Sequence, residues 1–329
     1  MRPATPLNPV SYARHPLHVV DRGWPESNCY VDLWIELLHA YGHEPLAALP
    51  FTLTADFEGD QWTFFKFPFA DLRKLFGVEV IELNLWQPLV THLEEQLARQ
   101  RASIVEVDAF FLPDTAATSY HTDHVKTTIA IHALDRAAGS LGYFHNAGYY
   151  ELAGSDFAGL FRLETASADH LPPYVEVAKF DVGPAPRGRA LVTESLDLLR
   201  THLDRRPRDN PFRRFGLGFA ADLDGLAGAP LTHFHGYAFA TFRQCGAAFE
   251  LGAAYLRWLE RHGEGGLERF ASACDDIAAT CKALQFKTAR LVSVKRAFDP
   301  APLLAVMAEA WDETMLGLAA RYGALVHHG

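Results

Sequence analysis

The chain has 329 residues, about half of them hydrophobic, and a formal net charge of −10. This length is enough to bury a core without disulfides or metals, and the acidic balance argues against general nucleic-acid binding. The four cysteines include no CxxC pair, and the first residues lack the apolar core of a signal peptide. No apolar run is long enough to cross a membrane. The sequence therefore predicts a cytoplasmic globular protein that binds neither nucleic acid nor membrane.

A helix that begins at a cysteine is predicted between residues 28 and 42. Apolar side chains recur with helical spacing at Val31, Trp34, Ile35 and Leu38. Asn28 can cap this helix and Gly42 can end it. Cys29 would lie in the first turn, where free N–H groups and the helix dipole favour a thiolate. Cys29 is thus either a nucleophile or a small buried packing residue, whereas the other cysteines predict packing alone.

The first half of the chain mixes strand and helix patterns. Strands are expected at residues 51–55, 62–67, 78–83, 103–112, 124–132, 141–145 and 174–180, with the first two forming a hairpin. Shorter helices are expected at residues 69–76, 88–101 and 155–161.

The second half is almost entirely helical in pattern. Helices are expected at residues 190–204, 211–226, 232–261, 267–284 and 300–322. Because the pattern changes between residues 165 and 190, we expect an α+β domain at 1–170 and a mainly helical domain at 171–329. The sheet of the first domain should be mostly antiparallel.

A thiolate nucleophile needs a base, and the base needs a group that orients it. His124 opens a β-branched strand, and His145 and Asn146 end the strand expected to pair with it. With a turn near residue 137, His124 should meet Asn146 or His145 across the hairpin. Cysteine at a helix start, histidine at a strand start and asparagine at the end of the next strand is the arrangement of papain-like cysteine enzymes. The structural alternative is that His124 caps a strand and Asn146 forms a turn.

These segments resemble the family of the butirosin-biosynthesis acyltransferase, whose N-terminal domain is papain-like. The resemblance rests on Asn28-Cys29 at the start of a helix, on the segment from Asp108 to Pro113, and on His124 at the start of a strand. It covers most of residues 25–165 and, weakly, the helical half. Residues 124–129 and 141–146 are more closely similar to a bacterial branch often found with carrier-protein genes.

The resemblance implies that an acyl or aminoacyl group moves from the phosphopantetheine thioester of a carrier protein, through acyl-Cys29, to an amine. It implies His124 as the base. The third position departs from the family's aspartate, and Asn146 is preferred there over His145 because an amide oxygen can accept from the imidazole N–H. Asn28 is a candidate for the oxyanion hole, and Asp108 a candidate partner of His124. No bound cofactor is expected, since the substrate arrives on phosphopantetheine.

Other functions remain open from the sequence. The same residues could serve a cysteine hydrolase or peptidase, and a non-catalytic binding protein could keep the fold. His121, His124 and His145 could bind a metal, but without a helical HExxH motif no metal is expected. No glycine-rich phosphate loop is present, so nucleotide chemistry is not expected.

A basic cluster lies at the start of the helical half, at Arg205, Arg206, Arg208, Arg213 and Arg214. It predicts either a solvated loop and helix start or a docking surface for the acidic carrier protein.

Overall fold

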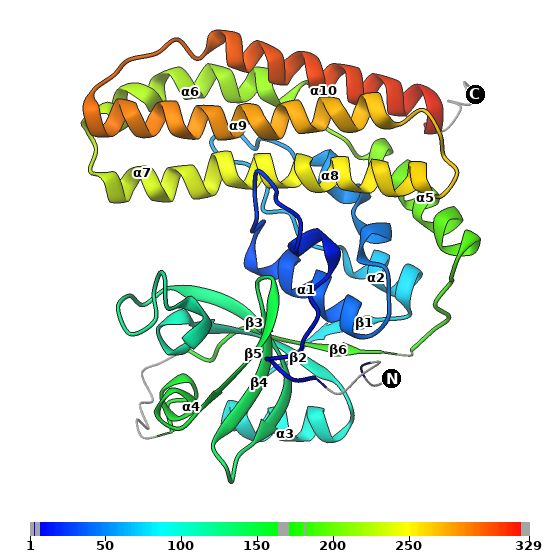
Figure 1. Ribbon diagram of the computed structural model, residues 1–329, viewed down its shortest axis with the longest axis vertical. Coiled ribbons are helices and arrows are strands. Elements are labelled where there is room, and N and C mark those ends of the chain that lie inside the picture. The colour runs from blue at the N-terminus through cyan, green and yellow to red at the C-terminus, as the bar shows by residue number, and fades with distance from the viewer. Residues whose placement is uncertain (1–2, 4–6, 164–170, 181, 324–329) are drawn as a thin grey trace. The chain divides into compact units, whose positions relative to one another are not determined.

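The computed structural model describes residue 3 and residues 7–163, 171–180 and 182–323 (Figure 1). The chain divides into two compact units that exchange segments. The first contains Met1–Val20, Asn28–Pro45 and Phe69–Ala185, and the second contains Asp21–Ser27, Leu46–Pro68 and Pro186–Gly329. An α+β part followed by a helical part is confirmed. The sequence placed the domain boundary at residue 170, which lies outside the described residues. The observed division differs because the last strand, Val175–Lys179, follows that position, and because the early segments Asp21–Ser27 and Leu46–Pro68 belong to the second unit.

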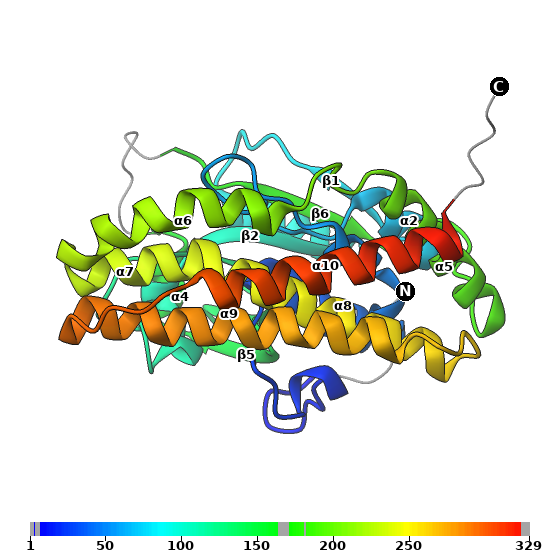
Figure 2. The ribbon, with the colours of Figure 1, turned by 90° about the horizontal axis from the view of Figure 1, so that it is seen from above.

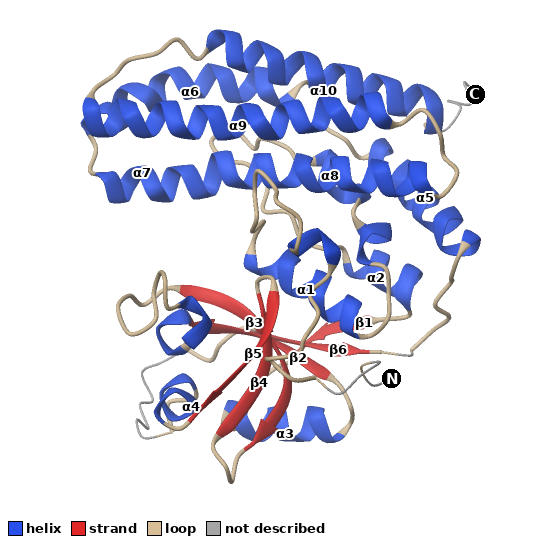
Figure 3. Cartoon of the chain, in the orientation of Figure 1, coloured by secondary structure: helices blue, strands red, loops and turns tan. Residues whose placement is uncertain are grey.

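In the described residues, six antiparallel strands form one sheet with the order β1-β6-β2-β3-β4-β5, drawn in red in Figure 3. Their bounds are β1 (Glu79–Glu82), β2 (Ala102–Asp108), β3 (Lys126–Asp135), β4 (Ser140–His145), β5 (Gly148–Ala153) and β6 (Val175–Lys179). The antiparallel pairing was predicted. β5 was not, because its aromatic start directly follows a two-residue turn and was not read as a separate strand.

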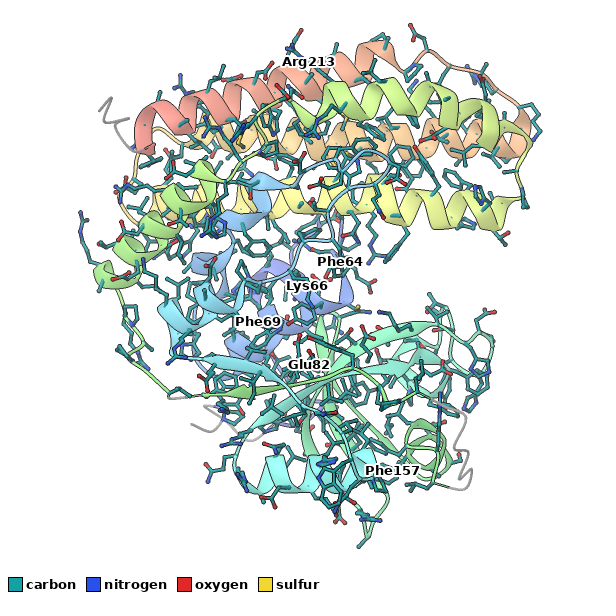
Figure 4. All side chains as sticks on the ribbon, turned by 180° about the vertical axis from the view of Figure 1, so that it is seen from behind. Phe64, Lys66, Phe69, Glu82, Phe157 and Arg213 are labelled. Atoms are coloured by element: carbon teal, nitrogen blue, oxygen red, sulfur yellow. The ribbon has the colours of Figure 1, made fainter. Side chains whose placement is uncertain are left out.

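The two faces of this sheet are covered by different helices. On β3, Ile129 and Ile131 join a buried apolar cluster with side chains of α3 (Leu89–Ala98) and α4 (Ser155–Leu160), including Phe157, which is labelled in Figure 4. α1 (Cys29–Ala40) packs on β3, β4 and β5. The His132 ring contacts Tyr41 at the end of α1. Since side chains alternate along a strand, even-numbered residues of β3 up to His132 face α1 and odd-numbered residues up to Ile131 face α3 and α4, whereas a bulge between Ile131 and Ala133 reverses this order for Leu134.

The second unit is built mainly from long helices. They are α5 (Arg189–Asp204), α6 (Pro211–Gly228), α7 (Leu231–Ala238), α8 (Gln244–Arg261), α9 (Glu268–Val294) and α10 (Ala301–Tyr322). α9 and α10 run side by side in Figure 2 and pack on each other. The helix expected at residues 232–261 is interrupted by a π-helical turn at Phe239–Arg243. Periodicity does not show this interruption, because both flanking helices bury the same kind of side chains.

The hairpin expected at residues 51–67 is wrong. Pro50–Thr54 forms a 3-10 helix, and a single bridge joins Phe57 to Trp62. Thr52 and Thr54 each donate their hydroxyl to the carbonyl three residues earlier, which favours a turn over a strand. Except for Phe64, the large apolar residues of this segment are buried; for example, Trp62 packs against Phe212 and Phe215 in the second unit. Apolar content alone therefore misled the strand prediction.

One further helix belongs to the first unit. The helix expected at residues 69–76 is α2 (Phe69–Phe76), which Gly77 follows with a φ of 63°. Within the described residues, no helix has the length and apolar character needed to cross a membrane.

Candidate functional site

Cys29 is the first residue of α1, as the sequence predicted. The Asn28 side chain accepts a hydrogen bond from the Val31 backbone N–H at 2.9 Å, and so caps the helix. Cys29 is half-buried, whereas Cys245, Cys274 and Cys281 are buried in the helical unit. The packing role predicted for those three is consistent with their burial. The Oδ1 atom of Asn28 serves the cap, so the helix N-terminus offers backbone N–H groups rather than this oxygen to an anion.

His124 forms a hydrogen-bonded pair with Asp108. Its Nδ1 atom lies 2.6 Å from Oδ2 of Asp108, and its ring stacks on Phe110 with centroids 4.5 Å apart. Among the described residues, no group bonds to Nε2. This arrangement favours the tautomer in which Nδ1–H donates to the carboxylate and Nε2 carries a free lone pair. Asp108, which the sequence suggested as a partner of His124, is therefore confirmed as one.

A groove of about 890 Å³ opens beside this pair. His124 and Asp108 line it, together with a second charged pair in which the Lys126 Nζ atom lies 2.7 Å from the Glu106 carboxylate. Its remaining wall is largely apolar, with Leu85, Leu89, Val107, Phe111, Leu160 and Phe161. Cys29 is not among the described residues that line the groove.

Strand parity gives Asp108 the sheet face that α1 covers, but the groove that Asp108 and His124 line has its apolar wall on the other face, with Leu89 of α3 and Leu160 of α4. Asp108 pairs with Lys126 in the β2–β3 register, and His124 lies two residues before Lys126. Because Ala109 N–H bonds to Val125 O, the strand pattern continues to this point. His124 therefore has the same parity as His132, which contacts Tyr41 of the α1 end.

α1 also runs in the same direction as β3. Near its start, Tyr30 donates to Glu176 at 2.6 Å, and after its end Tyr41 stacks on Phe180. β6, which holds Glu176, is parallel to β3, since both are antiparallel to β2. The start of α1 and the start of β3 therefore lie toward the same edge of the sheet.

Counting residues gives the offset between Cys29 and His124. From Tyr41 back to Cys29 the helix spans about 18 Å, at roughly 1.5 Å per residue. From His132 back to His124 the strand spans about 26 Å, at roughly 3.3 Å per residue. Counted from this contact, His124 lies about 8 Å beyond Cys29 along the strand direction, and counted from the Tyr30–Glu176 contact, which is level with Ala130, it lies further away. In the described structure, the Cys29 side chain makes no hydrogen bond.

His145 lies on the opposite face of the sheet, so its expected approach to His124 is wrong. Its Nδ1 atom lies 2.5 Å from Asp114, and its Nε2 atom lies 2.7 Å from the Thr127 hydroxyl. Thr127 and Tyr143 are odd-numbered positions that face away from α1, and Tyr143 also donates to Asp114. The side chain of His145 is only 2% exposed. This buried network ties the segment after β2 to the sheet.

Asn146 does not lie opposite His124 either. Ala130 pairs with Phe144, so the register continues toward Thr128 opposite Asn146. His124 is four residues further along, about 13 Å away at 3.3 Å per residue. Asn146 instead begins the turn between β4 and β5, with a φ of 44° that asparagine tolerates. The alternative prediction that Asn146 forms a turn is therefore confirmed. The cross-strand contact was wrong because pairing centred on residue 137 carries His124 past the end of β4.

A buried polar cluster on α1 was not predicted. The His18 ring lies between two α1 carboxylates, with Nδ1 2.5 Å from Glu36 and Nε2 3.2 Å from Asp32. All three side chains are fully buried, and Tyr12 donates to Glu36 at 2.6 Å. Burial opposes protonation of His18, but hydrogen bonds and charges from Asp32 and Glu36 outweigh it and raise the pKa of His18. Asp32 and Glu36 lie off the apolar stripe, which is the signal that could have found them.

The basic cluster of the helical unit lines a cavity of about 680 Å³. Arg213 pairs with Asp312 at 2.7 Å, and Arg214 pairs with Asp56. Arg205 and Arg208 are exposed, and the described residues hold no ion-pair partner for them. Internal pairing therefore neutralises part of the predicted docking surface.

The described residues contain no group of three or more histidine, cysteine, aspartate or glutamate side chains suited to a metal ion. Cofactor use stays a prediction from the sequence.

Two family models match the chain. The DUF1839 N-terminal domain matches residues 13–180, and the DUF1839 C-terminal domain matches residues 188–320. The interval between the matches contains the point, after Ala185, where the chain enters the helical unit for the last time. A search among curated proteins finds no match. Neither family match concerns the butirosin-biosynthesis acyltransferases.

Proposed function

This chain is a member of the DUF1839 family, and we propose that it is a cysteine-dependent acyl- or aminoacyltransferase with a papain-like site. The observation that carries the proposal is the His124–Asp108 pair, which lies at the start of β3, toward the same end of the strands as the start of α1. A base oriented by a carboxylate and a cysteine at a helix N-terminus are two parts that covalent acyl transfer needs. Asp108 takes the orienting role that the sequence assigned to Asn146 or His145.

In the first half-reaction, Nε2 of His124 accepts the thiol proton of Cys29, and the Cys29 sulfur attacks the carbonyl carbon of a thioester. The backbone N–H groups at the start of α1 stabilise the oxyanion that forms. The carbon–sulfur bond to pantetheine then breaks, and the leaving thiolate takes a proton from Nε2 of His124. The products are acyl-Cys29 and the free pantetheine thiol.

In the second half-reaction, an amine nitrogen attacks the acyl-Cys29 carbonyl carbon. Nε2 of His124 accepts the proton that the nitrogen loses, and the bond to Cys29 breaks. The Cys29 sulfur takes the proton from Nε2, so the product is an amide and both Cys29 and His124 return to their starting states. If water replaces the amine, the same steps release a free acid, which is the hydrolase reaction.

The proposal requires movement. Cys29 and His124 are offset by about 8 Å or more along the strand direction, and catalysis needs hydrogen-bond contact or one bridging water. His124 lies on a segment that precedes β3, and its side chain is 70% exposed. Substrate binding would therefore have to draw this segment toward Cys29.

The donor in this proposal is a carrier protein with an acyl group on its phosphopantetheine. Carrier proteins are acidic as a class, so the exposed Arg205 and Arg208 are the available contacts for one. Arg206 donates to the Leu203 carbonyl, while Arg213 and Arg214 are paired within the unit. These three can contribute less to docking than the sequence suggested.

The test is to mix the protein with a hexanoyl-loaded carrier protein and to measure the mass of the intact protein by mass spectrometry. A mass increase of one hexanoyl group in the wild type, absent in Cys29→Ala, is the expected result. An amine added afterwards should remove the group as an amide, whereas loss as free hexanoic acid would favour a hydrolase. No adduct, or an equal adduct in Cys29→Ala, would refute the proposal.

A further inference from the structure

The groove beside His124 has a largely apolar wall and a polar end. The polar end consists of two pairs, His124 with Asp108 and Lys126 with Glu106, and each pair is neutralised within itself. Arg162, another charged residue of the lining, is exposed. The rest of the wall is mostly aliphatic or aromatic. A ligand inside the groove therefore meets apolar surface and almost no uncompensated charge.

Large apolar side chains are also exposed around this groove. Val125 is 49% exposed and Leu171 is 91% exposed, and both line it. Trp86, between the lining residues Leu85 and Gln87, is 80% exposed. Val125 and Leu171 therefore add exposed apolar surface to the groove lining.

We propose that this groove binds the apolar acyl chain of the substrate, with the reacting carbonyl toward the His124–Asp108 end. The proposal rests on the proposed function for the identity of the ligand as an acyl group. A volume of about 890 Å³ is within the range of small-molecule sites, and apolar walls with a few polar groups at one end are typical of them. The acyl class is therefore an uncharged aliphatic or aromatic chain rather than a short polar one.

Gly159 and Phe111 shape the wall of this groove. A Cβ atom added at Gly159 would lie 2.2 Å from Cε1 and 2.6 Å from Cδ1 of Phe111. The Phe111 ring would have to move, and both the methyl group and the displaced ring would take up groove volume. Leu160, the next lining residue, offers the opposite change, because Leu160→Ala removes side-chain volume.

The experiment measures binding without reaction, in the Cys29→Ala protein. The ligands are S-acyl N-acetylcysteamine thioesters, from acetyl to decanoyl, titrated by calorimetry. The affinity should rise about fourfold per added methylene, until the chain fills the groove. Gly159→Ala should end this rise at a shorter chain, and Leu160→Ala at a longer one. Gly218→Ala is the control, since a Cβ there meets nothing within 4 Å.

Affinity that does not depend on chain length would overturn the inference. So would stronger binding of a succinyl than of a hexanoyl thioester, or an equal shift in the Gly218→Ala control. Melting temperatures of the variants show whether each is folded. Chain-length-dependent binding without acyl-Cys29 in the wild type would refute only the proposed function, whereas acyl-Cys29 with flat affinities would refute only the groove inference.

Discussion

The Nδ1 atom of His124 lies 2.6 Å from Oδ2 of Asp108, although the His124 side chain is 70% exposed. An exposed imidazole would ordinarily rotate freely, but here a carboxylate and the stacked Phe110 ring restrain it. Asp108 also accepts from the Phe110 backbone N–H, so the carboxylate itself is oriented. The pair is thus an imidazole and a carboxylate that hold each other in a fixed orientation in the lining of a groove.

Replacing Asp108 by asparagine should lower turnover by about 10²–10⁴-fold, because the amide no longer holds the imidazole in the required tautomer and charge state. Release of the pantetheine thiol from an acyl-loaded carrier, followed with a thiol reagent, measures this. Glu95→Gln is the control, since it removes an exposed carboxylate that is paired with Arg99 and does not line the groove. A loss of twofold or less in Asp108→Asn would exclude Asp108 from the reaction.

The cap at Asn28 should contribute to stability by itself. Asn28→Ala removes the acceptor for the Val31 N–H and is expected to lower the free energy of unfolding by about 1 kcal/mol. Asn28→Asp keeps an acceptor at the same place and should recover most of this loss. Urea denaturation measures both variants, and equal stabilities for alanine and aspartate would contradict the cap.

His18 should make stability depend on pH. Its pKa is raised in the folded protein, so its contribution is complete below the ordinary histidine pKa and is lost as pH rises through the folded value. The free energy of unfolding should therefore fall as pH rises above about 6.5. Urea denaturation of wild type and His18→Gln between pH 5 and 9 isolates this component, because the variant should lack it.

Other groups near His18 act in the same range, so only the difference between the two proteins is informative. Burial, followed by the charge of His15, lowers the pKa of His39, which has the opposite effect on the pH dependence. Burial, followed by the charge of Glu36, raises the pKa of Tyr12 beyond the range tested. Parallel curves for wild type and His18→Gln would show that His18 is not protonated in the cluster.

Gly246 should not tolerate a side chain. A Cβ atom there would lie 2.4–2.6 Å from atoms of the Trp24 indole, whose Nε1 donates to the Ala278 carbonyl. Gly246→Ala should destabilise the protein by about 1–3 kcal/mol, although glycine to alanine within a helix normally stabilises. Gly218→Ala, with open space around its Cβ, should be neutral or stabilising in the same thermal denaturation. Similar melting temperatures for the two variants would contradict the predicted packing.

Local patterns predicted much of the fold. The start of α1 at Cys29 followed from the Asn28 cap and helical spacing, and β3 followed from a β-branched run. Such signals depend on neighbours in the chain. The segment at residues 50–54 was mispredicted because its apolar residues are buried by helices from the other end of the chain, which no local pattern reveals.

The site depended on strand register, which is harder to predict. Asp108 was noticed beside His124, and the structure pairs them. The expected contact with Asn146 failed by four residues, because the length of β3 beyond its partner is not visible in the sequence. The expected contact of His145 with His124 also failed, because a shift of one residue along a strand places a side chain on the other face of the sheet.

The interleaving of the two units affects how the chain folds during synthesis. Trp24 donates hydrogen bonds to Glu250 and to Ala278, which follow it by 226 and 254 residues. The residues just before Cys29 therefore cannot form these hydrogen bonds until most of the chain has left the ribosome. The segment that precedes the cysteine-bearing helix is therefore completed late in synthesis, only after α8 and α9 have been made.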